Sequence, residues 1–278
     1  MKKSIAIIGA GPAGCTLATL LQRQGHKVAL FNDSKKTEIF VGESLIPAII
    51  PILRELGVEE EVKKFSVHKP GATVWINPQN FAEASFGGGM GSLPTYAYNT
   101  NRKTFDTLLL KTALDSGVKL FEFKAEIETE GDRVLLSDKS LKNCEEFFKE
   151  QPDFIVDASG RKRVISNTLK LPSTKGKRMD TALFAHVKER KFNENYGDIH
   201  MHLATKGWCW RIPLPDKTSV GLVINKDKLA EFGETLEDQF DNYLKTDPKL
   251  KSFFEDVQRV TPIQKYSNYQ LASDRIVG

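Results

Sequence analysis

Apolar residues at the start of the chain predict a strand, a helix and a second strand. The apolar run at residues 5–8 predicts a buried strand. Helical spacing follows in Leu17, Leu20 and Leu21, Gly25 ends the helix, and KVALF predicts the next strand. A strand–helix–strand unit of this kind is typical of a parallel sheet, so this part of the chain predicts an α/β fold.

The rest of the chain is richer in strand-like stretches, and helical spacing returns twice. One face of RKTFDTLLLKTALDSGV carries Phe105, Leu108, Leu109 and Ala113, and one face of GETLEDQFDNYLKTD carries Leu236, Phe240, Tyr243 and Leu244. The sequence therefore predicts an α/β protein that is α+β overall, with a Rossmann-like domain interleaved with a β-rich one.

Three glycines, Gly9, Gly11 and Gly14, fit G-x-G-x-x-G between the first predicted strand and its helix. The first allows a tight turn, the second lets the backbone approach a pyrophosphate, and the third lets helix pack on strand. The helix amides then face the phosphates. This context favours dinucleotide binding over a simple turn, and Pro12 and Ala13 favour FAD over NAD by their resemblance to flavoproteins.

The end of the second predicted strand departs from the dinucleotide-binding pattern. The position that usually carries a carboxylate for the ribose hydroxyls is Asn32, and Asp33 follows it. An amide oxygen accepts a hydroxyl hydrogen bond without charge-assisted strength. Asn32 is slightly favoured over Asp33 as the residue that binds the ribose hydroxyls. Asp33 would take this role if the strand end is shifted by one residue.

Charge and hydropathy exclude several classes of protein. The 40 Lys and Arg against 36 Asp and Glu give a net charge of +4, with no dense basic run, so no nucleic-acid partner is predicted. No apolar stretch is long enough for a membrane span, and no cleavage pattern follows the N-terminal apolar run. A cytoplasmic location is the default expectation.

Few residues suggest a metal or a disulfide. Cys15, Cys144 and Cys209 are far apart and form no CxxC pair. His200 and His202 share a strand face, but no third ligand stands at a sensible spacing. A packed or solvated histidine pair and no metal site are therefore predicted.

Three further segments place polar residues where a cofactor can be held: VGESLIP at residues 41–47, RKTFD from Arg102, and FIVDASGR at residues 154–161. Arg102 begins a helix, where the dipole disfavours a cation, so we expect it to serve an anion or a cofactor rather than to be a solvated first-turn residue. FIVDASGR predicts a buried strand that ends in a ligand-facing loop.

Together, GAGPAG, GESLIP, RKTFD and DASGR resemble the FAD-dependent monooxygenase superfamily, and within it the branch of flavin-dependent halogenases and geranylgeranyl-reductase-like oxidoreductases. The resemblance covers essentially the whole chain. It implies that the GESLIP strap lines the flavin, that the arginine contacts FAD, and that DASG lies by the FAD phosphates and ribose. The residues so implied are Gly42, Glu43, Ser44, Arg102, Asp157, Ala158, Ser159 and Gly160.

The segment WCWRIP resembles the W-x-W-x-I-P signature of flavin-dependent halogenases. Trp208 and Trp210 point to one strand face. The resemblance implies a wall near the isoalloxazine that keeps the organic substrate from the flavin hydroperoxide, so that a halide takes the oxygen and gives hypohalous acid. The alternative is that both rings fill the core of a sheet.

The segment FSVHKPGATVW is similar to the K-x-G-A segment of the same family. The resemblance implies that Lys69 receives or polarises the hypohalous acid. In an apolar tunnel its pKa would be lowered. The alternative is a surface lysine at the turn before Pro70.

The resulting hypothesis is an FAD-dependent oxidoreductase that resembles flavin-dependent halogenases. It would use O2, a halide, a small organic substrate and reduced FAD from a separate flavin reductase. The alternatives are a monooxygenase or ene-reductase on the same scaffold, and a non-catalytic remnant. The predicted domains are residues 1–66 and 99–172 for FAD, 67–98 and 173–264 for substrate, and 265–278 for the start of a return strand.

The last apolar residues, Ile276 and Val277, read as the start of a buried strand. In the resembled family this strand leads into a G-D-A flavin segment and a long helical portion. We therefore expect the chain to be a fragment or a truncated gene product; the alternative is a natural, compact C-terminus. Residues 1–278 alone would then bind FAD weakly or not at all, would not halogenate, and would be marginally stable.

Overall fold

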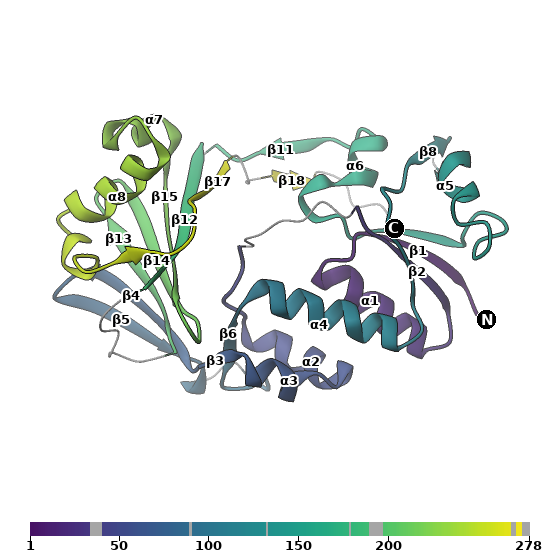
Figure 1. Ribbon diagram of the computed structural model, residues 1–278, viewed down its shortest axis with the longest axis horizontal. Helices are drawn as coiled ribbons and strands as arrows, with labels where there is room; N and C mark the ends of the chain where they lie inside the picture. Colours follow the sequence, from purple (N-terminus) through teal and green to yellow (C-terminus); the bar gives the residue numbers. More distant parts are fainter. Residues whose placement is uncertain are drawn as a thin grey trace. The chain divides into compact units, whose positions relative to one another are not determined.

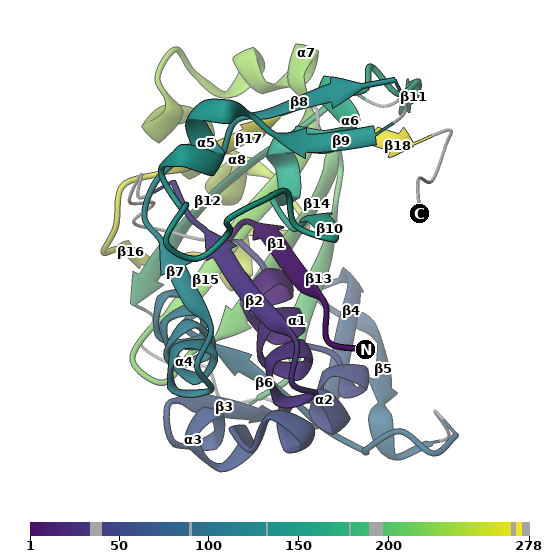
Figure 2. The same cartoon turned by 90° about the vertical axis from the view of Figure 1, so that its right-hand side faces the viewer.

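The structure is a computed structural model that describes residues 1–33, 41–88, 91–131, 133–177, 179–188, 197–267 and 271–273. The chain packs into two compact units, each built from separate segments. Unit 1 contains Met1–Glu38, Lys103–Ser173 and Ser273–Gly278, and unit 2 contains Ile39–Arg102 and Thr174–Ala272. Figures 1 and 2 show the elements of both units.

Unit 1 is built on a parallel sheet in the order β10-β1-β2-β7. Its strands are β1 (Ser4–Ile8), β2 (Lys27–Phe31), β7 (Lys119–Phe121) and β10 (Phe154–Asp157), and its long helices are α1 (Pro12–Arg23) and α4 (Arg102–Asp115). Figure 2 shows β1 and β2 side by side, with α1 connecting them. The predicted strand–helix–strand unit is therefore confirmed.

The strand predicted from FIVDASGR forms at the edge of this sheet. A buried strand was expected, but Phe154 is 55% exposed and the three residues after it are only partly buried, so the expected burial is incomplete. The remaining elements of unit 1 are β8 (Ile127–Glu130), β9 (Arg133–Leu136), α5 (Asp138–Lys142), η3 (Gly160–Lys162) and α6 (Val164–Thr168).

Unit 2 is built on an eight-stranded sheet in the order β16-β12-β15-β14-β13-β4-β5, with β17 also paired to β12. Its strands are β4 (Gly71–Asn77), β5 (Asn80–Ser85), β12 (Asp180–Lys188), β13 (Ile199–Ala204), β14 (Gly207–Pro213), β15 (Thr218–Asn225), β16 (Gln258–Arg259) and β17 (Gln264–Ser267). The β13–β4 pair is parallel and the other pairs are antiparallel.

Alternation along the strands gives the large sheet two different faces. One face packs under α8 (Leu236–Thr246), which contributes the buried Phe240, Tyr243 and Leu244 (Figure 1). The helix predicted from GETLEDQFDNYLKTD is thus confirmed. The other face, here called the tryptophan face, is formed by Ala182, Phe184, Trp210, Ile212, Leu214 and Val223, with Ile199, Trp208 and Tyr266 packed against them.

A smaller layer of unit 2 consists of β3 (Ser66–Lys69) paired antiparallel with β6 (Ala97–Thr100). The helices α2 (Ile50–Leu56) and α3 (Glu59–Lys64) precede β3. Short elements complete the unit: η1 (Pro47–Ile49), η2 (Phe86–Gly88), β11 (Ser173–Lys175), α7 (Lys226–Leu229), η4 (Ala230–Phe232), η5 (Lys251–Phe253) and β18 (Leu271–Ser273).

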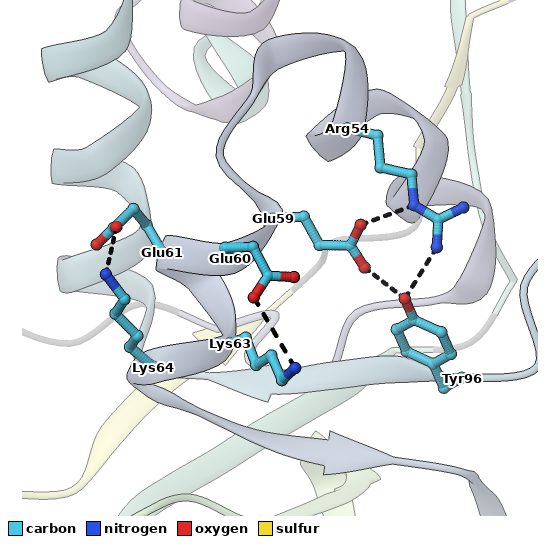
Figure 3. A network of polar contacts seen from close by, with 7 residues as sticks. All are labelled: Arg54, Glu59, Glu60, Glu61, Lys63, Lys64 and Tyr96. Atoms are coloured by element: carbon cyan, nitrogen blue, oxygen red, sulfur yellow. Dashed lines mark hydrogen bonds and ion pairs between the residues drawn. The ribbon is translucent and has the colours of Figure 1, made fainter.

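A polar network fastens α2 and α3 to the segment before β6. The Arg54 guanidinium donates from Nε to Glu59 at 2.7 Å and from Nη2 to the Tyr96 hydroxyl at 3.0 Å, and that hydroxyl donates to Glu59 (Figure 3). The Tyr96 ring stacks on His68 at 5.3 Å. Through Tyr96 and His68 this network is connected to β3, the strand that carries Lys69.

The two units and the predicted domains divide the chain in similar but not identical places. The units change at residues 38/39, 102/103, 173/174 and 272/273, whereas the sequence predicted changes at 66/67, 98/99, 172/173 and 264/265. Residues 41–66, with α2 and α3, pack in unit 2. A return strand into the FAD-binding domain was predicted over 265–278. Residues 265–267 instead belong to β17, which pairs with β12 in unit 2, and residues 268–270 and 274–278 lie outside the described residues.

Candidate functional site

The glycine-rich turn of unit 1 brings together the carboxyl ends of β1, β2 and β10. The Gly9 amide donates to the Phe31 carbonyl at 2.8 Å, and the Ala158 amide donates to the Ile8 carbonyl at 2.9 Å. Gly9 has φ +111°, and a Cβ there would overlap the Ala158 carbonyl. In parallel α/β sheets this edge is where ligands bind.

Gly11 and Gly14 have different reasons for lacking a side chain. A Cβ at Gly14 would overlap the Gly9 carbonyl oxygen, because helix and strand approach closely there. A Cβ at Gly11 would meet no atom within 4 Å, so the space beside it is open. The fold itself therefore requires glycine at position 14. At position 11 the fold would accept a side chain, so the glycine there leaves space that a ligand can use.

The N-terminus of α1 is suited to an anion. Gly11 is its N-cap, Pro12 is its first residue, and neither a side-chain cap nor a first-turn acid is present. The amides of the first turn therefore face open space beside Gly11 with the positive end of the helix dipole. The turn fits the pyrophosphate of a dinucleotide such as FAD.

The residues after β2 differ in how their side chains are engaged. The Asp33 carboxylate forms an ion pair with Lys162 at 3.1 Å. The Asn32 amide nitrogen of the backbone donates to the Phe121 carbonyl at 2.9 Å, and no hydrogen bond of the Asn32 side chain is formed with the described residues. The Asp33 carboxylate is therefore engaged by a lysine, whereas, within the described residues, the Asn32 side chain is not.

The DASG loop organises itself through its own side chains. Asp157 accepts from the Ser159 amide at 2.9 Å and from the Ile165 amide at 2.8 Å, and the Ser159 hydroxyl donates to Asp157 while accepting from the Val164 amide at 3.1 Å. Gly160 has φ +60° with open space around it. The side chains of Asp157 and Ser159 thus hold the loop in shape, whereas Ala158 and Gly160 contribute only backbone groups to it.

The strap of residues 41–47, predicted to line the flavin, lies in unit 2 beside β6. The Thr100 amide donates to the Glu43 carbonyl at 2.8 Å, and the Leu45 amide donates to the Tyr98 carbonyl at 2.9 Å. The Arg102 guanidinium donates from Nη1 to the Val41 carbonyl, and a Cβ at Gly42 would crowd that same nitrogen. Arg102 therefore contacts the strap backbone.

Lys69 is buried, so the alternative of a surface lysine is wrong. Its residue is 4% exposed, and its Nζ donates to the Ser44 hydroxyl at 2.8 Å and to the Leu45 carbonyl at 2.9 Å. The Phe86 ring centroid lies 5.1 Å from Nζ. Burial lowers the pKa of Lys69 from 10.5 to about 8, against the opposing pull of the Asp198 charge.

The two tryptophans lie on the same face of β14, as alternation predicted. Their ring centroids are 5.8 Å apart, and Trp210 also lies 6.2 Å from Phe184. Trp210 is 7% exposed and lies over Gly221, where any Cβ would overlap its ring. Trp208 is only partly buried. Trp210 therefore fills the core of the tryptophan face, whereas Trp208 packs against it and stays partly exposed.

The histidine pair is packed under the helical face of the large sheet. Trp75 donates from Nε1 to Nδ1 of His200 at 2.9 Å, and the His202 ring stacks on Trp75 and meets Phe253 edge to face. Burial first, then the Arg211 charge, lowers the pKa of His202 to about 2. Among the described residues no cluster suitable for a metal is found, and all three cysteines are free and buried.

Three residues of unit 2 were missed by sequence reasoning. Gly221 makes room for Trp210, and Asp198, whose pKa is raised mainly by burial, lies near Lys69. His186 binds the Glu43 carboxylate, with Nε2 and Oε1 2.7 Å apart, and both side chains are buried. A signal for His186 exists in retrospect, since it interrupts the apolar strand DTALFAHVK.

The glycine-rich turn with the N-terminus of α1, here called the cradle, and the parallel sheet beside it define a dinucleotide-binding protein. Comparison with known proteins gives the family. Residues 4–93 and 72–260 match the tryptophan halogenase family, so the chain belongs to that family. The predicted family and the α/β fold class are thereby confirmed.

Three similar proteins illustrate the range of the family. A 1H-pyrrole-2-carbonyl-[peptidyl-carrier protein] chlorinase of Pseudomonas fluorescens is 27% identical over 99% of this chain and 67% of its own length. The tryptophan 2-halogenase of Chondromyces crocatus is 31% identical over 91% of this chain and 49% of its own. The myxobacterial chondrochloren halogenase CndH, an FAD-dependent halogenase, superposes with a TM-score of 0.81 at 28% identity, covering 98% of this chain and 65% of that one.

The chain spans about half to two thirds of the length of the relatives it matches. In the described part of the chain, no helix is both long and apolar enough to cross a bilayer.

Proposed function

We propose that the protein is an FAD-dependent halogenase: it oxidises a halide to hypohalous acid and directs the halogen to an electron-rich carbon of a small organic substrate. The activity is proposed for the whole protein to which this sequence belongs. The partners proposed with it are O2, a halide and a separate flavin reductase, and the proposed location is the cytoplasm. One observation carries the proposal most: a buried lysine with a lowered pKa is held by the strap in a chain of this family.

The cofactor would be held by the cradle of unit 1. The open space at Gly11 and the uncapped amides of α1 fit the pyrophosphate, and the Asn32 side chain would take a ribose hydroxyl. When bound and reduced, FAD supplies the two electrons that, with O2, a halide and one proton, give oxidised FAD, hypohalous acid and water. Halogenation then replaces a ring hydrogen and releases water.

Lys69 would position the hypohalous acid. With a pKa of about 8 the amine is still mostly protonated at neutral pH. Two N–H groups of the ammonium are used by Ser44 and Leu45. The third is left to polarise the oxygen of hypohalous acid, which makes the halogen more electrophilic. The neutral fraction, which grows above pH 8, is the nucleophilic form.

Trp208 and Trp210 would exclude the organic substrate from the reacting flavin. Their ring centroids lie 5.8 Å apart on the tryptophan face, and the missing side chain of Gly221 makes room for the Trp210 ring. A direct monooxygenase or an ene-reductase would use this space as its substrate pocket. The family match favours halogenation over both.

The cofactor assignment is tested on the whole protein with a matched pair of glycine variants, by FAD titration followed by flavin fluorescence. Gly11→Val should keep the fold, because the site is open and its backbone is not left-handed, but should lose FAD. Gly14→Val should lose the fold of unit 1, because its side chain would meet the Gly9 carbonyl. If Gly11→Val binds FAD as well as the parent, the turn is not the cradle.

The role of Lys69 is tested on the whole protein, expressed from its complete gene. Lys69→Ala should still release hypohalous acid, detected with a 1,3-diketone trap, but an excess of that trap should abolish its halogenation of a phenol or an indole probe, because only freely diffusing acid is left to react. Lys63→Ala, at a lysine whose side chain is 63% exposed, is the control and, like the parent, should keep halogenating the probe in the presence of the trap. Parental halogenation of the probes by Lys69→Ala in the presence of the trap would remove Lys69 from the mechanism.

A further inference from the structure

The buried pair formed by Glu43 and His186 joins the two layers of unit 2. Glu43 belongs to the strap, which is hydrogen-bonded to β6 in the small layer. His186 belongs to β12, in the large sheet, and stands two residues after Phe184 on the same face. Because Phe184 packs on Trp210, that face is the tryptophan face. The pair therefore links the layer that carries Lys69 to the layer that carries the tryptophans.

The chemistry of the contact makes it strong and directional. The Glu43 and His186 residues are 3% and 5% exposed, and Nε2 lies 2.7 Å from Oε1. In the tautomer of His186 that carries its proton on Nε2, the imidazole donates to the Glu43 carboxyl oxygen. A hydrogen bond to a carboxylate in a dry environment is among the stronger ones, and leaving that carboxylate unpaired would be strongly unfavourable.

The neighbouring strap residue reaches the lysine. Ser44 accepts from Nζ of Lys69 at 2.8 Å, and the next residue, Leu45, offers its carbonyl to the same Nζ at 2.9 Å. A displacement of Glu43 thus moves both groups that hold the ammonium. A second hydrogen bond also connects the layers: Asn99 donates from Nδ2 to the Gly197 carbonyl at 2.8 Å. Because this bond does not involve His186, we expect unit 2 to fold without that side chain.

We propose that His186 is a positioning residue for the reaction: by binding Glu43 it fixes the strap, and so sets where the Lys69 ammonium stands relative to the tryptophan face. The catalytic part of this inference rests on the proposed function, because Lys69 needs a position only if it takes part in halogenation. Its structural content, that His186 controls the enclosure of Lys69, is measurable without flavin or halide.

The test uses reductive methylation of lysines, read by mass spectrometry as the ratio of Lys69 to the exposed Lys63 in the same sample. His186→Leu should raise this ratio at least about fivefold, since an opened strap exposes the amine. His186→Gln, whose amide can donate to Glu43 from a similar place, should return the ratio to near the parental value.

Two further variants separate positioning from loss of stability. Val187→Ala changes the next residue of β12, which faces α8, and should lower the unfolding midpoint without changing the ratio. Glu43→Leu with His186→Leu removes the unpaired carboxylate, so stability should recover while the ratio stays high. A ratio within about twofold of the parent in both His186→Leu and the double variant would overturn the proposal.

These outcomes are independent of the proposed function. Failure of the parent protein to bind FAD or to halogenate would refute the function but leave the labelling result intact. A parental labelling ratio in both His186→Leu and the Glu43→Leu, His186→Leu double variant would refute the positioning role whether or not the protein halogenates.

Discussion

Replacing Lys69 with methionine should change how the stability of unit 2 depends on pH. Burial lowers the pKa of Lys69 from 10.5 to about 8. The folded-state pKa is thus below the unfolded one, and between the two values the unfolded chain binds more protons. The lysine therefore penalises folding fully below pH 8, and the penalty disappears as the pH rises toward 10.5.

The size of the effect follows from the shift. At ~1.36 kcal/mol for each pH unit, a shift from 10.5 to about 8 amounts to about 3 kcal/mol. Methionine has a similar volume and no charge, so it escapes the penalty. It also loses the hydrogen bonds to Ser44 and Leu45, worth about 1 kcal/mol each at any pH. The change of the stability difference with pH is therefore the informative quantity.

The assay is urea unfolding followed by tryptophan fluorescence. All three tryptophans, Trp75, Trp208 and Trp210, belong to unit 2, so the signal reports the unit that contains Lys69. The advantage of Lys69→Met over the parent should fall by about 3 kcal/mol between pH 7.5 and pH 10.5. Lys63→Met, at an exposed lysine, is the control. A difference that stays constant within about 0.5 kcal/mol would refute the burial argument.

Three other substitutions test separate parts of the structure. Gly221→Ala should displace the Trp210 ring and destabilise unit 2 by about 1–3 kcal/mol, with a shift in tryptophan emission; an unchanged spectrum and midpoint would contradict the packing seen here. Asn32→Ala should weaken FAD binding in a fluorescence titration more than Asp33→Ala does, since Asp33 is paired with Lys162; the reverse order would assign the ribose to Asp33. Thr235→Ala should cost about 1 kcal/mol in urea unfolding, because the Thr235 hydroxyl caps α8 by accepting from the Asp238 amide at 3.1 Å; no loss would mean the cap is dispensable.

The parts of the fold that follow local periodicity were predictable from the sequence. The first strand, helix and second strand have regular apolar spacing and a glycine turn, and α4 and α8 have clear apolar faces. The exposure of β10 was not predictable, because FIVD has the apolar composition of an interior strand. Only the order of the strands reveals that it lies at an edge.

The candidate site was predictable only where a motif carries it. Gly11 and Lys69 stand in recognisable segments, and the structure places one beside open space and buries the other. His186 lies 143 residues from Glu43 in the sequence, and no local pattern connects two positions so far apart. Gly221 was missed for a related reason: its role depends on the Trp210 ring of the neighbouring strand.

The most direct test of the account is whether the whole protein, expressed from its complete gene, makes an oxidised halogen in a halide-dependent way. It would be supplied with FAD, a flavin reductase, NADH and O2, with catalase to remove free peroxide and a 1,3-diketone as trap. The account predicts that halogenated trap forms with chloride or bromide present and that none forms without halide or without FAD. Bound, reduced FAD that consumes O2 without any halogenated trap would contradict it.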